Sequence, residues 1–574
     1  MLLLIGRYYL WSVRSAGYEF EWGRDHGGYY NYLGRALASG RLHLPIDSSI
    51  EMHDMARHNG RYYLYHGAAP AVLLFAPWRW ATGHDLPENL ALFLLCFGGF
   101  LFSAGTLLKI FELGGITPGP ALTAVSIAAV GLCQCVPYLL SRVWVYEVAI
   151  GGGYFFLSAA FFFLVYGLSG RHAVYSLAAS GLMFGMAIGC RPHLGFAAPF
   201  ALGGLLLMRV PMRRIAIFLM PFLTVCALIG AYNFARFGDP FDFGITHLIA
   251  GEHQNRIKLS AEYLAPGLYY LLFCAPEVMP VFPWFHVVFR PPYHSPGGAL
   301  PAGYVIEAAT GAFYVSPILL GALFLWAAKG MARILLGVLL ATAGAICIVL
   351  ASAGWVTQRY EVDFLPYGVL AAVAAVVVAI AKTGGLSRMM LTAFFGIAVA
   401  FGIVVNLALG IAGPYHEMLK RRPGRFVTIA GWFSPVAGLR PALNPRLTVE
   451  FTVHLDAKGN GVREPLLTLG HQAARYFLIA QSRGEEVEVV SQADDSTERC
   501  VLRADGPLSF RVQYAPETGN VTVDVNGAPA MNHHIGALVT APSQITPGEN
   551  RVEANISAAR FSGRLEKVRI EVGR

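Results

Sequence analysis

Long apolar runs separated by short polar stretches dominate the first 413 residues. A helix that crosses a membrane needs about 20 apolar residues. The pattern predicts ten such spans, at 86–109, 118–138, 148–168, 173–190, 193–208, 215–233, 312–328, 332–352, 364–381 and 390–412. We therefore expect a polytopic α-helical membrane protein.

Residues 2–16 form a shorter apolar segment that contains Arg7 and Arg14. Either it is a tilted first span whose arginines reach the headgroups, or part of the span lies upstream of Met1. Because no small-residue cleavage site follows it, we do not expect a signal peptide. Counting it gives about 11 spans.

The pattern changes after residue 440. Leu447–Leu455 alternates between apolar and polar residues with a period of two, which is typical of a half-buried strand. Similar runs follow at 474–480, 486–490, 508–514 and 520–525, and Asn526-Gly527 is a strong hairpin signal. This spacing predicts an all-β sandwich. We divide the chain into a membrane domain (1–413), a linker (414–440) and a β-sandwich (441–574).

Composition supports two bodies of different character. The chain is 55% hydrophobic and 14% charged, with a mean hydropathy of +0.51. A soluble domain carries about 25% charged residues, so a single soluble globule is excluded. Residues 441–574 hold 14 Lys and Arg against 16 Asp and Glu, so the net charge of +8 comes from the membrane part. We attribute it to membrane topology and expect no nucleic-acid partner.

The distribution of Lys and Arg orients the spans. One set of connections holds nine basic residues and is expected to be cytoplasmic, because basic residues concentrate there. The other set is poorer in them and faces outward, together with loops 17–84 and 234–311 and the C-terminal domain. One observation opposes this placement, since a basic cluster follows the last span: Lys420, Arg421, Arg422 and Arg425.

Loop 17–84 begins with the most informative residues. Tyr29, Tyr30 and the leucines that follow recur at helical spacing up to Ala38, after which Gly40 can end the helix. We expect this helix to lie in the membrane interface. Asp25 precedes it and has two interpretations: a helix-capping acid, or a general base that takes a proton from an acceptor hydroxyl.

The rest of this loop is apolar and rich in histidine. Residues 68–82 carry Pro70 and Pro77, and we expect a second interfacial helix there. A divalent metal site is possible, although no compact ligand motif is present. Its candidate ligands are His26, His43, His53, His58, His66, Glu51 and Asp54. No metal or other cofactor is assigned.

The outward first loop, its early acidic residue and the Pro-apolar-Gly segment before the next span resemble the GT-C glycosyltransferases. The aminoarabinose-transferase and protein-mannosyltransferase-like members are the most similar, over roughly residues 1–415. The resemblance implies a polyprenyl-phosphate-linked sugar donor bound among the spans. It implies that Asp25 deprotonates the acceptor, which is a glycan, lipid or protein.

Further charged and aromatic residues gather at the same outward edge. Arg359, with Arg191, is expected to hold the leaving phosphate through charge-assisted hydrogen bonds. Substrate contacts are expected from Arg142, Glu147, Tyr360, Asp363, Tyr29 and Tyr30. The alternative is that Arg359, Glu361 and Asp363 pair with one another and only fix loops. Arg236 and Asp239 are expected to pair in a turn.

These observations predict a membrane glycosyltransferase that acts at the outer face of a bacterial-type cytoplasmic membrane. The alternative from another class is a transporter or flippase of lipid-linked glycans that performs no chemistry. Transporters favour inverted repeats and mid-membrane charges, and neither is found here. The stretches 523–527 and 561–565 resemble laminin-G/concanavalin-like sandwiches, which either bind glycans or serve only as packing modules.

Overall fold

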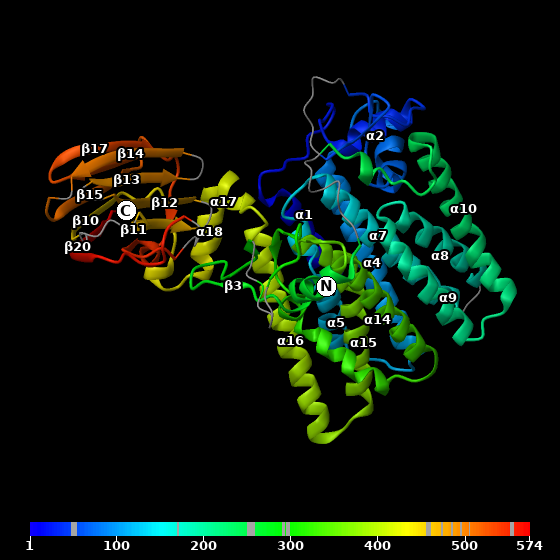
Figure 1. Cartoon of the computed structure of the whole chain (residues 1–574). Helices are drawn as coiled ribbons and strands as arrows, with labels where there is room; N and C mark the ends of the chain where they lie inside the picture. The colour runs from blue at the N-terminus through cyan, green and yellow to red at the C-terminus, as the bar shows by residue number, and fades with distance from the viewer. Residues whose placement is uncertain are drawn as a thin grey trace. The chain divides into compact units, whose positions relative to one another are not determined.

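Apolar helices build the first of two compact units, which comprises Met1–Glu277 and Phe285–Pro414 (Figure 1). The structure is a computed structural model. It describes residues 1–46, 54–168, 172–249, 259–289, 293, 299–454, 461–471, 474–483, 486–493, 496–503, 505–551 and 556–573. The second unit comprises Val278–Trp284 and Tyr415–Arg574.

Six helices in the described part of the first unit are long and apolar enough to cross a membrane. They are α4 (Glu88–Leu113), α7 (Val145–Gly167), α10 (Met212–Phe237), α14 (Gly330–Ala351), α15 (Leu365–Lys382) and α16 (Gly385–Ala412). Each lies where the apolar pattern predicted a span. The N-terminal unit is therefore a helical, membrane-type structure.

The other expected spans are helical but shorter. They correspond to α1 (Leu2–Ser15), α5 (Pro120–Leu132) with α6 (Val136–Leu139), α8 (Ala173–Ile188), η2 (Pro192–Phe196) with α9 (Ala197–Leu207), and α13 (Ala312–Val315) with η6 (Pro317–Ala327). A 14-residue helix such as α1 is only about 21 Å long, against a hydrocarbon core of about 30 Å. Their length alone therefore does not identify them as spans.

Glycines in α7 allow the helices around the site to approach closely. A Cβ atom on Gly151 would lie 2.9 Å from Leu92 in α4, and one on Gly152 would lie 2.8 Å from Pro70. Small residues at such positions are typical of helix contacts within membranes. The start of α7 is thereby held against the first outward loop.

That loop contains the two predicted helices. The first is α2 (Tyr29–Ala38), which ends before Gly40 as expected. The second comprises the π-helical turn η1 (Ala71–Phe75) and α3 (Ala76–Thr82), preceded by the hairpin of β1 (Ala56–His58) and β2 (Arg61–Tyr63). Their placement in the interface stays a prediction.

Asp25 does not cap α2, so that interpretation is wrong. The N-cap residue is Gly28, and the carboxylate of Glu88 in α4 accepts a hydrogen bond from the backbone N–H of Tyr30 at 3.2 Å. A side chain on Gly28 would collide with this carboxylate, which explains the glycine. The capping residue lies almost 60 positions away in the sequence, so the sequence around α2 could not predict it.

Short elements of loop 234–311 complete the unit. They are η3 (Ile245–His247), η4 (Ala261–Tyr263), α12 (Leu264–Leu268), η5 (Tyr269–Phe273), and β3 to β7 (Glu277–Val278, Phe285–His286, Val288–Phe289, Val305–Ile306 and Ala308–Ala309). Strand β6 pairs in parallel with β8 (Trp355–Val356), just before η7 (Gln358–Asp363). This pairing brings Glu307 close to Arg359.

The second unit is strand-rich. After α17 (Glu417–Arg421), α18 (Pro423–Phe433), η8 (Ala437–Leu439) and β9 (Ala442–Leu443) come two five-stranded antiparallel sheets, in the orders β17-β16-β15-β10-β20 and β14-β13-β12-β11-β19. The larger strands are β10 (Leu447–His454), β11 (Arg463–His471), β12 (Ala474–Arg483), β13 (Glu486–Ala493), β14 (Ser496–Arg503), β15 (Leu508–Ala515), β16 (Asn520–Val525), β17 (Ala528–His534) and β20 (Arg564–Val572). Shorter elements are β18 (Val539–Thr540), η9 (Pro542–Gln544) and β19 (Thr546–Pro547).

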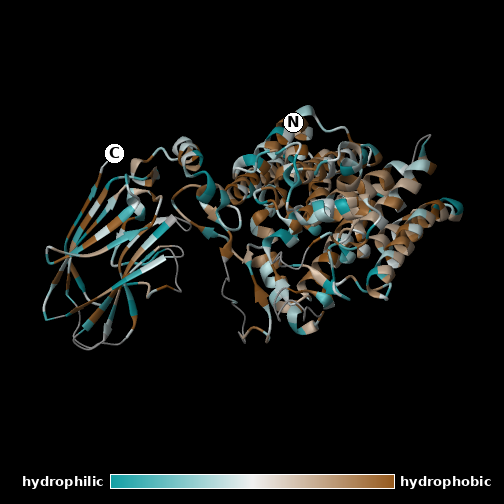
Figure 2. Cartoon of the chain, turned by 90° about the horizontal axis from the view of Figure 1, so that it is seen from above, coloured by the Kyte–Doolittle hydropathy of each residue, from teal (hydrophilic) through white to brown (hydrophobic). Residues whose placement is uncertain are grey.

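Alternation along the strands gives both sheets a shared core. In β10 every second residue from Leu447 to Val453 is buried, and Phe451 stacks on Phe510 of β15 with ring centroids 5.4 Å apart. Asn526 and Gly527 both have positive φ and join β16 to β17, which confirms the predicted hairpin. Figure 2 shows brown and teal alternating along these strands, whereas the helical unit is largely brown.

We expect residues 441–574 to fold alone, because the core of the two sheets comes entirely from Leu447–Leu565. Chemical denaturation of this fragment should be cooperative. Val449→Ala, at a fully buried site, should lower the free energy of unfolding by about 1.5–3 kcal/mol. Val501 is 63% exposed, so Val501→Ala should change it by less than about 0.5 kcal/mol. A fragment without a cooperative transition would contradict the prediction.

Candidate functional site

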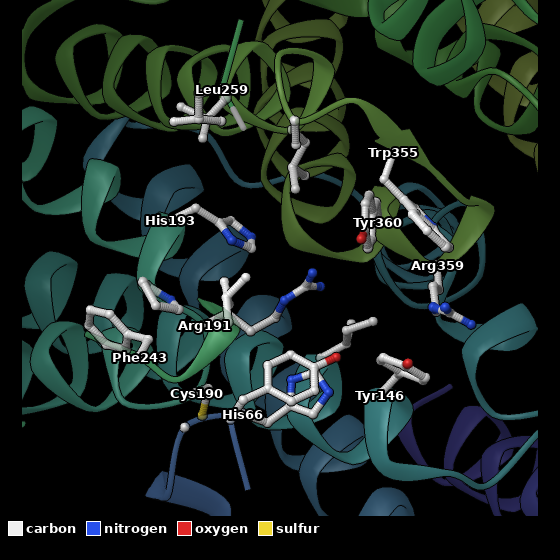
Figure 3. A pocket seen from close by; sticks show the side chains of 18 of the residues that line it. His66, Tyr146, Cys190, Arg191, His193, Phe243, Leu259, Trp355, Arg359 and Tyr360 are labelled. Carbon is white, nitrogen blue, oxygen red and sulfur yellow. The ribbon is translucent and has the colours of Figure 1, made fainter. Parts of the chain in front are cut away.

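A cavity of about 440 Å³ lies where several loops of the helical unit meet (Figure 3). Its lining comes from separate stretches of the chain, among them the residues just after β2, the start of α7, the turn after α8, β8 and η7. Polar and aromatic residues from these stretches include Tyr65, His66, Tyr146, Arg191, His193, Trp355, Arg359 and Tyr360. Two guanidinium groups and two imidazoles therefore share one hollow.

Arg191 is held by a buried carboxylate. Its Nη1 lies 2.5 Å from Oδ2 of Asp363, which is 1% exposed, and the His193 ring nitrogen Nε2 lies 3.0 Å from the same oxygen. The guanidinium lies over the ring of Tyr360, 5.0 Å from its centroid. Asp363 thus positions a cation and an imidazole that both face the cavity.

Arg359 is held in a similar way by two other acids. Its Nη2 lies 3.2 Å from Glu307, its Nη1 lies 3.8 Å from Glu147, and its guanidinium lies 4.4 Å from the ring centroid of Tyr146. Burial acts to lower the pKa of Arg359, but the charges of Glu307 and Glu147 raise it above its ordinary value. Arg359 is therefore a permanent cation in a fixed orientation.

His66 contributes a neutral imidazole. Burial, together with the charges of Arg191 and Arg359, lowers the pKa of His66 to about 3. Within the described part of the chain, neither Nε2 of His66 nor Nε of Arg359 has a hydrogen-bond partner, and both atoms are buried. Buried polar atoms are nearly always hydrogen-bonded, so two such atoms at one cavity indicate a site for a polar ligand.

The loop that carries His66 is fixed by backbone contacts. The N–H of Gly67 donates to the carbonyl of Cys190 at 3.2 Å, and the N–H of Ala69 donates to that of Gly189 at 2.9 Å. A Cβ atom on Gly67 would overlap the backbone of Gly189. Only glycine permits this approach, which places His66 beside Arg191.

The structure brings some of the sequence-predicted residues to the cavity and leaves others away from it. Arg191, Arg359 and Tyr360 line it, and Glu147 and Asp363 lie behind the two arginines as their partners. Three others are not among its lining residues. Arg142 lies over Trp144, Tyr30 donates from its hydroxyl to the carbonyl of Gly67 at 3.2 Å, and Tyr29 opens α2.

Asp25 also lies outside the lining of the cavity. Its side chain is 54% exposed, with Oδ1 2.5 Å from Nη1 of Arg79 and Oδ2 3.9 Å from Arg35. Slight burial acts to raise its pKa, but the hydrogen bond from Arg79 and the two arginine charges hold the pKa of Asp25 below its ordinary value. The same arginines bind the buried Asp85, so the cluster joins α2 to α3.

Two predicted ion pairings are wrong. Arg359, Glu361 and Asp363 do not pair with one another, because each meets a partner from a distant segment; Glu361 accepts a hydrogen bond from Cys135 at 2.9 Å. Arg236 donates to the carbonyl of Leu64 and to Asn233, whereas Asp239 accepts from the backbone of Phe241. The first set of charges meets partners from distant segments, whereas Arg236 and Asp239 each find other partners, of which only Leu64 is distant in sequence.

No metal site is apparent in the described residues. No three His, Cys, Asp or Glu side chains among them are grouped to bind an ion. Two of the candidate ligands, Glu51 and His53, lie outside these residues.

Sequence reasoning missed several residues of the site. Glu307 lies in a long loop without a clear pattern, and only the β6–β8 pairing reveals its role. His193 and Tyr146 lie close to the predicted residues Arg191 and Glu147 in the sequence but were given no role. Asp54 was not missed, since it is one of the candidate metal ligands named above; it has a φ of +62°, and its carboxylate accepts a hydrogen bond from Tyr146.

An apolar groove lies next to the charged cavity. It is formed by the end of α8, the C-terminal half of α10 and residues 240–243, and Phe243 lines both hollows. Its other lining residues include Ile188, Ile229, Phe234 and Phe241. The polar cavity and the apolar groove are therefore adjacent, with Phe243 lining both.

Comparisons with known proteins gave matches among solved structures only. No protein-family model matches the chain, and no curated protein matches it significantly in sequence. ArnT from Cupriavidus metallidurans is similar in its apo state, with 16% identity, a TM-score of 0.39, and coverage of 75% of this chain and 79% of that one. The same enzyme bound to undecaprenyl phosphate matches with 14% identity and a TM-score of 0.38.

Two further similarities concern other proteins. The Archaeoglobus fulgidus oligosaccharyltransferase matches with 13% identity and a TM-score of 0.34, covering 76% of this chain but only 57% of that one. The CBM40 of Ruminococcus gnavus IT-sialidase, bound to α2,3-sialyllactose, matches 23% of this chain with 16% identity and a TM-score of 0.18. The ArnT and oligosaccharyltransferase structures each align with about three quarters of this chain. At these TM-scores the activity has to be argued from the site itself.

Gly67→Ala tests the packing that builds the site. The new methyl group would overlap the backbone of Gly189, and overpacking of this kind costs about 1–3 kcal/mol. We expect the midpoint of thermal unfolding in detergent to fall by several degrees. Gly203→Ala in α9 is the matched control, because a Cβ atom there meets no atom within 4 Å and the midpoint should be unchanged. Equal midpoints for both variants would refute the close approach.

Proposed function

We propose that the chain is a membrane glycosyltransferase that transfers a sugar from a polyprenyl-phosphate-linked donor to an acceptor. The observation that carries the proposal is the cavity with two fixed guanidinium groups and two buried nitrogens that have no hydrogen-bond partner among the described residues. Guanidinium groups suit phosphate oxygens because their N–H groups match them in geometry and charge. The phosphate of the donor would therefore lie between Arg191 and Arg359.

The groove beside the cavity supports a lipid-linked donor over a soluble sugar nucleotide. A polyprenyl chain is apolar and needs an apolar path, and the groove along α8 and α10 begins at the wall that the two hollows share. In this arrangement the phosphate binds in the charged cavity and the first isoprene units pass Phe243. The ArnT structure named above contains undecaprenyl phosphate, a lipid of the same class.

The site would assist the reaction mainly through charge. The acceptor oxygen attacks the anomeric carbon, and the bond from that carbon to the phosphate oxygen breaks. The electron pair passes to the phosphate, whose negative charge increases. Arg191 and Arg359 are already oriented by Asp363, Glu307 and Glu147, so they can stabilise this charge without rearranging. Neutral His66 adds a hydrogen bond but no charge.

The acceptor proton requires a base, and we propose Asp25, following the family resemblance. The arginine pair that now holds Asp25 must then open when the acceptor binds, since catalytic contacts often form only in the complex. Asp54 is the competing candidate, because it already contacts Tyr146 in the cavity wall. The substrate contacts of Arg142, Tyr29 and Tyr30 also remain part of the proposal.

The finer topology belongs to the same proposal. We propose eleven membrane crossings, in which the short helices are tilted or the surrounding lipid is thinned. With eleven crossings, the cavity and the domain at 441–574 would lie on the extracytoplasmic side. The membrane domain would end at 413 and the linker would span 414–440. The distribution of Lys and Arg supports this orientation.

Transfer of a labelled sugar by the purified protein in lipid nanodiscs tests the function. The donor is a radiolabelled polyprenyl-phosphate sugar, and the readout is label on a water-soluble or lipid acceptor from a membrane extract. Loss of label from the donor with release of polyprenyl phosphate supports a transferase. In proteoliposomes, movement of the intact donor across the bilayer without cleavage would instead support a flippase.

Removal of the phosphate partners should weaken donor binding. Arg191→Gln and Arg359→Gln keep similar size and polarity but remove the charge, and a hydrogen bond to a charged group contributes about 1.5–3 kcal/mol. We expect the Kd for polyprenyl phosphate to rise about 10- to 100-fold. Arg333→Gln is the control, since Arg333 is exposed near the start of α14, whose last turns line the cavity. Unchanged binding in both site variants would contradict the proposed phosphate site.

Asp25→Asn and Asp54→Asn distinguish the two candidate bases. Removal of a general base costs about 10²–10⁴-fold in rate. We expect Asp25→Asn to lose turnover by this factor while its Kd for the donor is unchanged, and Asp54→Asn to retain turnover within about tenfold. The opposite result would assign the base to Asp54 and leave Asp25 as a structural link to Arg79.

A further inference from the structure

The segment after the last membrane helix forms a short helical element with a basic end and an aromatic end. It comprises α17 and α18, both labelled in Figure 1. Lys420, Arg422 and Arg425 are exposed near its start. Trp432 is 74% exposed, Phe433 51% and Val436 57% at its far end.

One face of α18 is fixed within the second unit. Phe426, Ile429 and Ala430 are buried, and Phe282 packs against both Phe426 and Phe433, with ring centroids 5.9 and 5.5 Å away. The remaining face carries Arg425, Thr428 and Trp432, which recur at helical spacing. Packing on one side therefore directs Arg425 and Trp432 outward together.

Chain connectivity keeps this face close to the membrane. Helix α16, the last apolar helix, ends at Ala412, only eight residues before Lys420. Eight extended residues reach no further than about 28 Å, and α17 shortens this distance. Lys420 therefore lies within about 28 Å of the end of α16, a distance that lets it reach the headgroups.

The charge of the segment matches an anionic surface. Residues 415–440 hold five Lys and Arg and one Glu, a net charge of +4, whereas residues 441–574 have a net charge of −2. A basic cluster on the outward side conflicts with the usual topological bias. Binding to acidic headgroups gives these basic residues a function on either side of the membrane, whichever way the chain is oriented in it. Trp side chains are also enriched at the membrane–water interface.

We propose that the α17–α18 element, within residues 415–440, docks on the membrane that the chain itself spans, as a site for anionic phospholipid headgroups. Lys420, Arg422 and Arg425 bind the headgroup phosphates, and Trp432 inserts at the level of the glycerol backbone. The element thereby holds the second unit against the membrane face. The inference rests on membrane insertion of the helical unit and not on the transferase reaction.

Depth-dependent quenching in the full-length protein tests the proposal. Cys226 and Cys500, the two cysteines that are not buried, are first replaced by Ser. A fluorescent label is then attached at Trp432→Cys, in nanodiscs that contain phosphatidylglycerol and doxyl-labelled lipid. Val501→Cys is the matched control, because Val501 is similarly exposed on β14. We expect strong quenching at position 432 and none at position 501.

The charge dependence is tested on the same labelled protein. Each basic residue near an anionic surface adds about fivefold to membrane binding, so replacement of Lys420, Arg422 and Arg425 by Gln should lower the docking equilibrium constant on the order of a hundredfold. Nanodiscs of phosphatidylcholine alone, or 1 M salt with the unmutated segment, should have the same effect without any risk of misfolding. Quenching at 432 no stronger than at 501 would overturn the proposal. So would quenching that is insensitive to lipid charge, salt and the Gln substitutions.

Discussion

Charged groups buried among apolar helices must be paired, and this constraint organises the site. Arg191 and Arg359 lie in a part of the molecule where an isolated cation would be costly to bury. Asp363, Glu307 and Glu147 offset that cost, and each comes from a different stretch of the chain. The pairs therefore fix η7, the turn after α8, the start of α7 and the β6 segment relative to one another.

The pairing leaves part of each guanidinium directed at the cavity. A guanidinium has five N–H donors, and the acids use only some of them. Nε of Arg359 and Nε2 of His66, two residues that line this cavity, are buried without a partner in the described structure. The site is thus fixed before a ligand binds but is incomplete without one. This combination suits a reaction in which charge develops on a phosphate.

Glycine determines how closely these elements can approach. Gly67 approaches the backbone of Gly189, and Gly152 approaches the ring of Pro70, at distances that leave no room for a Cβ atom. The second unit follows a different principle, since its strands bury alternate residues in a core of their own. Two distinct kinds of packing, within lipid and within water, thus coexist in one chain, and α17–α18 lies at the junction between them in the sequence.

The sequence alone determined the features that depend on local periodicity. Apolar runs located the six long helices, the period of two located the strands, and Asn526-Gly527 located a hairpin, because each of these is a property of neighbouring residues. It also identified Arg191, Arg359 and Tyr360, because their position at the ends of apolar runs can be recognised from the linear sequence. Only the tertiary structure decided which partner each charge meets: Glu88 caps α2 in place of Asp25, Glu307 pairs with Arg359, and Asp25 pairs with Arg79. Such partners lie about 50 to 60 residues apart along the chain, and the energy of a buried charge depends on distance in space rather than on position in the sequence.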